Sequence, residues 1–136
     1  MGFLIDTNVL SELRKGNKAN VGVRDWFANA DSDSLYISVL TLGEIRQGIE
    51  QLKRRDQQAA KSLECWLKQI ETESANFLLS VTQEIADCWG KINVPYKIPV
   101  IDGFLAATAL VHDLTLVTRN IRDVERSGVK LLNPFL

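Results

Sequence analysis

The sequence alternates short apolar runs with longer stretches of helical periodicity, and this alternation restricts the fold more than any other feature. The first apolar run, residues 3–5, leads directly into Asp6 and then into a helical pattern. A short continuous apolar run between polar residues is typical of a strand buried in a parallel sheet. Strands that alternate with helices predict βαβ units and a mostly parallel sheet. We expect strands at 3–5, 35–38, 77–80, 114–118 and 129–132.

The helical stretches have apolar faces that predict which side chains enter the core. We expect helices at 7–14, 20–30, 41–52, 57–72, 82–92, 100–111 and 120–126. Pro99 precedes the helix at 100–111, in keeping with the preference of proline for helix starts. With no linker, repeat or low-complexity segment, residues 1–136 are expected to form one α/β domain. Side chains expected to face inward include Val21, Val23, Trp26, Phe27, Ile85, Ala86 and Trp89.

Composition excludes several classes of protein. The net charge of −1 argues against a passive wrapper of nucleic acid, although an enzyme could still meet RNA through a metal and a few local cations. Cys65 and Cys88 lack the spacing of a zinc site or a disulfide framework, so we interpret them as core thiols in a reducing compartment. The sequence has no apolar run of membrane-spanning length. We therefore expect a cytoplasmic protein with no membrane partner.

Acidic residues recur where strands end and helices begin. Asp6 follows the first strand, Glu44 and Asp102 lie in the first turns of two helices, and Asn120 and Asp123 follow the strand at 114–118. The carboxyl ends of parallel strands meet at one edge of a sheet, so these groups can converge there. Converging carboxylates repel one another unless cations lie between them, and oxygen ligands favour Mg²⁺ or Mn²⁺. The pattern therefore predicts a metal site.

Each acid also has an ordinary structural interpretation. Asp6 and Asn120 are common helix caps. Thr41 and Glu44 have the spacing of a capping box, in which the glutamate accepts a hydrogen bond from a backbone N–H. Asp102 could simply interact with the positive end of its helix dipole, although the apolar helix around it leaves it without a cation nearby in sequence. These alternatives stay open at the level of sequence.

Four sequence blocks follow one another along the chain: LIDTNVL at 4–10, ISVLTLGEIRQGI at 37–49, IDGFLAATA at 101–109 and LTLVTRN at 114–120, with NPF at 133–135. In this order they resemble the PIN-domain family, and more narrowly the VapC-type toxins of bacterial toxin–antitoxin pairs. The resemblance covers nearly the whole chain. It implies a three-layer α/β/α sandwich and a metal-dependent endoribonuclease that hydrolyses RNA phosphodiester bonds with Mg²⁺, or Mn²⁺ as a substitute.

The resemblance also implies roles for individual residues. The three invariant acids of the family correspond to Asp6, Glu44 and Asp102. A fourth acid is usual where this chain has Asn120, so Asn120 or Asp123 would complete the site. From the sequence itself, Thr7, Asn8 and Thr118 either orient the carboxylates or are ordinary cap and turn residues. Arg46 and Arg119 lie close in sequence to Glu44 and Asn120 and are candidate contacts to substrate phosphates. In the mechanism that we expect, Asp6 and Asp102 bind the metal, Glu44 and Asp123 contact it directly or through water, and the metal activates a water molecule.

The implied partners are an RNA substrate and a cognate antitoxin, with a homodimer or a larger toxin–antitoxin assembly expected. The apolar stripe of Leu63, Trp66, Leu67 and Ile70 is either core or a groove for an antitoxin helix. Two other functions are kept open. An aspartyl-nucleophile phosphatase would need a second Asp where the chain has Asn8, and a non-catalytic RNA- or protein-binding PIN module would follow if Asn120 had weakened the site.

Overall fold

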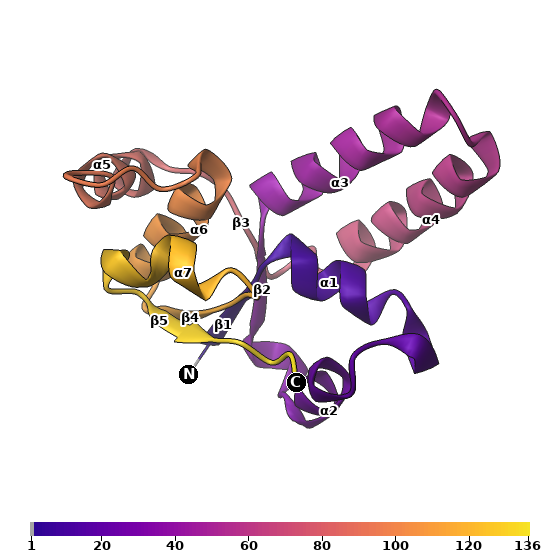
Figure 1. Cartoon of the computed structure of the whole chain (residues 1–136), viewed down its shortest axis with the longest axis horizontal. Helices are drawn as coiled ribbons and strands as arrows, with labels where there is room; N and C mark the ends of the chain where they lie inside the picture. The colour runs from indigo at the N-terminus through magenta and orange to yellow at the C-terminus, as the bar shows by residue number, and fades with distance from the viewer. Residues whose placement is uncertain (1) are drawn as a thin grey trace.

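The computed structural model describes residues 2–136 and contains a five-stranded sheet flanked by helices on both faces (Figure 1). Every strand pairing is parallel, and the strand order is β3-β2-β1-β4-β5. The prediction of a mostly parallel sheet is therefore confirmed. The strands are β1 (Gly2–Ile5), β2 (Leu35–Ser38), β3 (Leu78–Leu79), β4 (Leu114–Val117) and β5 (Lys130–Leu132).

The helices follow the predicted order along the chain. They are α1 (Thr7–Leu13), α2 (Val21–Asn29), α3 (Val39–Lys53), α4 (Gln57–Glu73), α5 (Gln83–Ile92), α6 (Val100–Val111) and α7 (Ile121–Val124). Short 3-10 turns lie at Gly16–Lys18, Ser32–Ser34 and Glu125–Ser127. The last of these ends at Gly128, whose φ of 81° is a conformation that glycine adopts without the clash a Cβ would cause.

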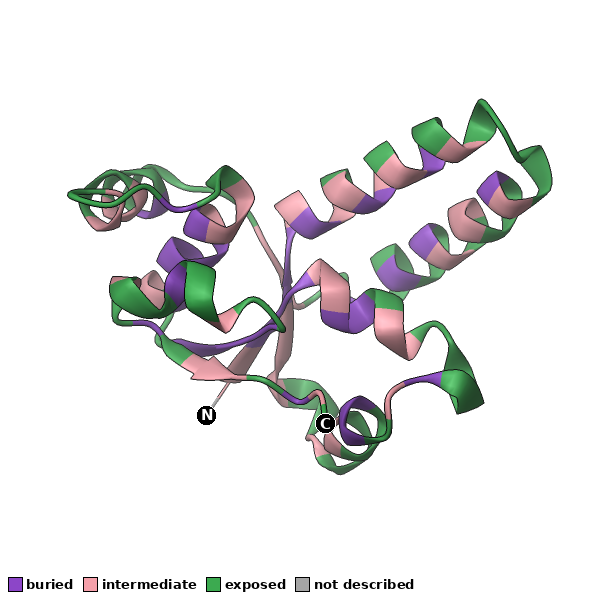
Figure 2. Ribbon diagram, viewed as in Figure 1, coloured by how far each residue is buried: buried purple, intermediate pink, exposed green. Residues whose placement is uncertain are grey.

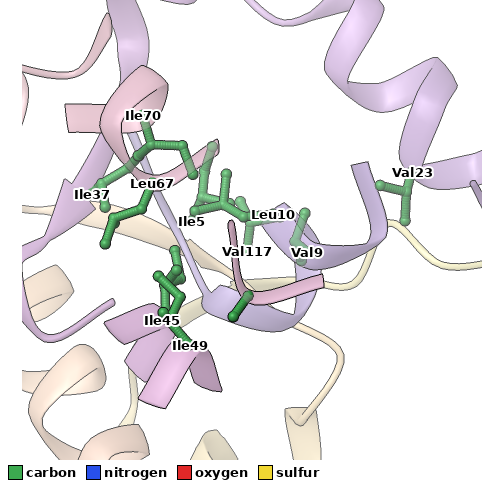
Figure 3. Close-up of a cluster of buried hydrophobic side chains, with 11 residues drawn as sticks. Ile5, Val9, Leu10, Val23, Ile37, Ile45, Ile49, Leu67, Ile70 and Val117 are labelled. Atoms are coloured by element: carbon green, nitrogen blue, oxygen red, sulfur yellow. The ribbon is translucent and has the colours of Figure 1, made fainter. Parts of the chain in front are cut away.

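Side chains alternate between the two faces of the sheet and form two separate cores. Ile5 and Val117 point into the core that α1–α4 cover, and Figure 3 shows both among its buried aliphatic side chains. Their neighbours Leu4 and Leu116 point to the opposite face, where they pack with Leu105 of α6. This alternation follows from the two-residue period of a strand. It produces the three-layer α/β/α arrangement implied by the family resemblance.

Helices α3 and α4 pack against each other as an antiparallel pair that extends outward from the sheet (Figure 1). Buried and exposed residues alternate along both helices (Figure 2). Leu67 and Ile70 of α4 are buried, and Leu63 and Trp66 pack against the same core. The apolar stripe of α4 is therefore part of the core, as the first of the two interpretations expected.

The order in which the chain adds strands to the sheet reverses between β1 and β4. The chain first builds outward from β1 through β2 to β3, and then crosses back to place β4 on the other side of β1. In open α/β sheets, ligands bind outside the carboxyl ends of the strands at such a switch point. The residues that follow β1 and β4, Asp6 and Thr118, therefore lie where the fold favours a site.

The start of α3 differs from the prediction. The helix begins at Val39, because Ser38 is its N-cap and the Ser38 hydroxyl accepts a hydrogen bond from the Leu40 N–H. Thr41 thus lies inside the helix, fully buried. The predicted capping box of Thr41 and Glu44 is wrong, since a serine at the strand end caps the helix first.

Several predictions of burial are also wrong. Val21 and Phe27 of α2 and Ala86 of α5 are exposed, because both helices lie at the periphery and bury only a narrow face. Cys65 is exposed on α4 and Cys88 only partly buried on α5, so they are not core thiols; both are free, as expected. Across residues 2–136, helices long and apolar enough to cross a membrane are absent.

Candidate metal centre

Asp6 is held in a fixed orientation at the carboxyl end of β1. It is the N-cap of α1, and its Oδ1 accepts a 2.7 Å hydrogen bond from the Thr7 N–H. Its Oδ2 accepts from the Thr118 hydroxyl at 2.7 Å and from the Asn8 amide at 3.2 Å. Burial raises the pKa of Asp6, and these three hydrogen bonds partly offset the rise. The carboxylate is thus buried, with a residue exposure of 5%, and hydrogen-bonded only to neutral donors.

Glu44 projects from the second turn of α3 toward the same point. Its Oε1 accepts a 2.6 Å hydrogen bond from the Thr7 hydroxyl, so Thr7 contacts both acids through its N–H and its Oγ1. Burial raises the pKa of Glu44, and the charge of Asp6 raises it further. Through this contact Glu44 is linked to the segment of Asp6, and its carboxylate does not accept a hydrogen bond from the N-terminal backbone of α3.

Asp102 lies in the first turn of α6 and completes the group. Burial raises its pKa from 3.8 to about 6, and the charges of Asp6, Asp123 and Glu44 contribute in that order. Within residues 2–136 no hydrogen bond stabilises the ionised Asp102. The charges of three acids from other segments of the chain therefore raise the pKa of Asp102, as expected where carboxylates lie near one another without a counter-ion.

The chemistry of this donor set fits a divalent cation. None of the ion pairs between residues 2–136 includes Asp6, Glu44 or Asp102. The available donors are carboxylate, hydroxyl and amide oxygens, which Mg²⁺ and Mn²⁺ prefer. Within the same residues, however, no three His, Cys, Asp or Glu side chains are grouped closely enough to hold an ion as they stand. Because like charges repel, a bound cation would have to draw the carboxylates together by side-chain rotation.

The turn after β4 is tied to the turn after β1. The Thr118 hydroxyl accepts from the Asn120 N–H at 3.0 Å while it donates to Asp6, and the Asn8 Oδ1 accepts from the Arg119 N–H at 3.3 Å. Asn120 itself is exposed, and its side chain makes no capping hydrogen bond to α7. Asp123, one turn later, is the residue whose charge acts on Asp102.

Arg46 lies away from the acids. Residues two apart on a helix point in nearly opposite directions, so Arg46 faces away from Glu44. It makes a two-pronged ion pair with Glu64 of α4, with N–O distances of 2.7 and 2.6 Å. The predicted phosphate contact by Arg46 would require its guanidinium to leave Glu64.

Arg119 lies at the edge of the site with its side chain directed toward the C-terminus. Its guanidinium lies 4.7 Å from the centre of the Phe135 ring, and its charge also acts on Glu12. Its backbone belongs to the turn that contacts Asn8, but its cationic group is turned from Asp6 toward Phe135. The expected phosphate contact by Arg119 would require the side chain to leave this ring.

Two pockets of about 350 Å³ each adjoin the acids, and their other lining residues were not identified from sequence. One lies beside Glu44, where the i, i+4 spacing of Val39, Gly43 and Gln47 could have indicated a shared helix face. The other lies beside Asp123. A larger pocket of about 560 Å³ lies at the opposite edge of the sheet, near Gly2 and Phe3, and contains none of the predicted site residues.

Comparison with known proteins places this geometry in context. Residues 3–127 match the family model described as "PIN domain". The VapC ribonuclease Y4jK of Sinorhizobium fredii is 29% identical over 142 residues, which cover 98% of this chain and 97% of that protein. Toxin FitB of Neisseria gonorrhoeae is also 29% identical, over 98% of both chains.

Solved structures share the fold over nearly the whole length. FitAcB from Neisseria gonorrhoeae superposes with a TM-score of 0.88 at 29% identity, covering 97% of both chains. A toxin–antitoxin complex from Klebsiella pneumoniae has the same fold, with a TM-score of 0.70 at 24% identity and 98% coverage of both chains. The match extends over all three layers.

Proposed function

The chain belongs to the PIN-domain family, and from this premise we propose that it is the ribonuclease toxin of a type II toxin–antitoxin system. One observation carries the proposal. Asp6, Glu44 and Asp102 lie near enough to the switch point of the sheet for their charges to act on one another, and no basic residue is paired to them in residues 2–136. A similarity to VapC ribonucleases over the full length supports the reaction class.

We infer that Asp6 and Asp102 are the metal ligands, with Glu44 and Asp123 completing the site directly or through water. A bound Mg²⁺ or Mn²⁺ would supply positive charge for the scissile phosphate and lower the pKa of water. The Thr118 hydroxyl and the Asn8 amide both donate to Oδ2 of Asp6 and so fix the orientation of its carboxylate, and the Thr7 hydroxyl donates to Oε1 of Glu44. These neutral donors orient the carboxylates without neutralising them, which leaves their charge available to a cation.

The proposed reaction is hydrolysis of an RNA phosphodiester. The oxygen of water forms a bond to phosphorus, the bond from phosphorus to one ribose oxygen breaks, and that oxygen takes a proton. Glu44 is suited to accept the proton of the attacking water, because burial and the neighbouring Asp6 raise its pKa and so make it a stronger base. The fragments would carry a phosphate on one end and a hydroxyl on the other.

The proposed protein partner is an antitoxin, in keeping with the fold shared with a toxin–antitoxin complex. An arginine or lysine of the antitoxin inserted among Asp6, Glu44 and Asp102 would compete with the metal for the same negative field. A homodimer, or a larger assembly with the antitoxin, belongs to the same proposal.

The test is cleavage of total cellular RNA by the isolated protein with Mg²⁺ or Mn²⁺. The wild type should cleave, EDTA should abolish cleavage, and Asp6→Asn and Asp102→Asn should each be inactive. Asp25→Asn is the matched control, because it makes the same chemical change on an exposed part of α2.

Equal cleavage by all of these proteins would overturn the assigned site. No cleavage by the wild type, together with no heat of Mn²⁺ binding in calorimetry, would overturn the enzyme and favour a non-catalytic RNA- or protein-binding module. A trapped phospho-aspartate would instead favour the aspartyl-nucleophile phosphatase.

A further inference from the structure

One of the two pockets beside the acids has a different chemistry from the site itself. It is about 350 Å³ in volume and lies between residues 96–99, which lead into α6, and the segment formed by α7 and its following turn. The first wall supplies Tyr96 and Lys97, and the second supplies Arg122 and Arg126. Cationic and aromatic side chains from two distant parts of the sequence therefore meet in one hollow.

The pocket is continuous with the carboxylate site. Asp123 lines the pocket and is also one of the charges that act on Asp102. Pro99, at the other wall, is the N-cap residue of α6 and precedes Asp102 by less than one turn. Helices α6 and α7 pack against each other (Figure 1). A chain molecule with its reacting bond at Asp102 would therefore pass into this pocket.

The cations of the pocket have no acidic partner among residues 2–136. The ion pairs there include Arg46 with Glu64 and Lys91 with Asp87, but none involves Lys97, Arg122 or Arg126. Asp123 and Glu125 also line the pocket, so cations exceed acids by one. Three unpaired cations beside a cluster of carboxylates indicate a surface arranged for an anion next to the metal centre.

The aromatic ring is presented for stacking. The Arg126 guanidinium lies 4.0 Å from the centre of the Tyr96 ring and covers one face of it. Tyr96 is nevertheless 60% exposed, so much of its ring is open to solvent. A large exposed aromatic side chain beside unpaired cations is typical of surfaces that bind single-stranded nucleic acid, where bases stack on rings and guanidinium planes.

We propose that Tyr96, Lys97, Arg122 and Arg126 form a nucleotide subsite for single-stranded RNA adjacent to the scissile bond. The base stacks on the face of the Tyr96 ring that Arg126 leaves open, and Lys97 and Arg122 contact the flanking phosphate. The proposal rests on the ribonuclease function argued above and adds the residues that hold the substrate. Stacking tolerates any base, so the subsite favours unpaired RNA without selecting a sequence.

The test measures binding separately from cleavage. A short fluorescein-labelled single-stranded RNA of mixed sequence is titrated with protein in EDTA, and fluorescence anisotropy gives the Kd at several salt concentrations. Tyr96→Ala should weaken binding on the order of tenfold without changing the salt dependence, and Tyr96→Phe should bind like the wild type. Lys97→Ala and Arg122→Ala should each reduce the slope of log K against log salt by about 0.7.

Arg55→Ala is the matched control. Arg55 is an exposed cation in the turn between α3 and α4, at the far end of α3 from Glu44. It should leave both the Kd and the salt slope unchanged. A thermal unfolding midpoint for each variant shows that the fold is retained, which is expected because Tyr96, Lys97 and Arg122 are all exposed.

The outcomes separate the subsite from the ribonuclease. If the wild type cleaves RNA while Tyr96→Ala and Lys97→Ala bind like Arg55→Ala, the subsite is overturned and the ribonuclease stands. If the wild type fails to cleave but Tyr96→Ala and Lys97→Ala show the expected losses, the subsite is supported and the ribonuclease is overturned. A wild type that neither binds nor cleaves RNA overturns both.

Discussion

Replacing Asp102 by asparagine should stabilise the metal-free protein at neutral pH while removing its response to metal. The native structure raises the pKa of Asp102 from 3.8 to about 6, chiefly by burial and then by the charges of Asp6, Asp123 and Glu44. An acid whose pKa is raised on folding binds more protons in the native state than in the unfolded state between those two values. Stability contributed by this group is therefore full below about pH 4 and is lost as the pH rises through about 6.

The magnitude follows from the pKa difference. A difference of about two pKa units corresponds to about 3 kcal/mol at pH 7, since each unit is worth about 1.4 kcal/mol. Asp102 is only partly buried, so solvent screening reduces this value, and we expect a gain of about 1 kcal/mol for Asp102→Asn. For a chain of this length, that gain raises Tm by about 3–4 °C.

The assay is urea or thermal unfolding of wild type and Asp102→Asn from pH 4 to 8 in EDTA. The difference in unfolding free energy should be near zero at pH 4 and should favour the variant above pH 6. Added Mn²⁺ should raise the Tm of the wild type but not that of Asp102→Asn. A variant that is less stable than the wild type at pH 7.5 in EDTA would refute the raised pKa of Asp102 on which the prediction depends.

Three further changes test the surroundings of the site. Thr118→Val removes the hydroxyl that donates to buried Asp6, so we expect it to lower the free energy of unfolding in urea by about 1–3 kcal/mol and to weaken Mn²⁺ binding. Thr118→Ser keeps a hydroxyl and should keep the stability and the Mn²⁺ affinity of the wild type; equal behaviour of the two variants would contradict a role for the hydroxyl. Arg46→Ala breaks a partly exposed ion pair with Glu64, so it should cost less than about 1 kcal/mol and leave the salt dependence of RNA binding unchanged; a lower salt slope would restore Arg46 as a phosphate contact. Ile49→Ala empties a fully buried position and should cost about 2–5 kcal/mol in the same unfolding assay; a cost below about 1 kcal/mol would mean that the core between α3 and the sheet can collapse around the gap.

The elements of the fold were predictable because their signals are local. Strand β1 is a continuous apolar run, and α6 combines a preceding proline with an almost wholly apolar sequence. The burial of Leu4 and Ile5 in β1 and of residues 105–109 in α6 follows from these apolar sequences. By contrast, α2 exposes Val21 and Phe27, because the amount of a helix that is covered depends on its place at the edge of the sheet. No periodicity within the helix carries that information.

The acids of the candidate site could be chosen from the sequence, whereas the contacts around them could not. Asp6 and Asp102 follow or open elements whose ends must meet at one edge of a parallel sheet, so their convergence follows from topology. The ion pair of Arg46 with Glu64 could not be predicted, because Glu64 is 18 residues away on another helix. Tyr96 and Arg126 meet only after α6 and α7 have packed, and no spacing in the sequence indicates such a contact.

The hydrogen bond between Thr118 and Asp6 joins residues 112 positions apart in the chain. During synthesis, Asp6 leaves the ribosome before its donor, which is added about 6–20 s later at about 5–20 residues per second. Strand β4, which pairs with β1 over all four of its residues, is equally late. A nascent or prematurely ended chain can therefore carry Asp6, Glu44 and Asp102 and still lack the strand that assembles them. On the proposed function, the cell would make this nuclease in a form that becomes able to cut RNA only after β4 and Thr118 have been added.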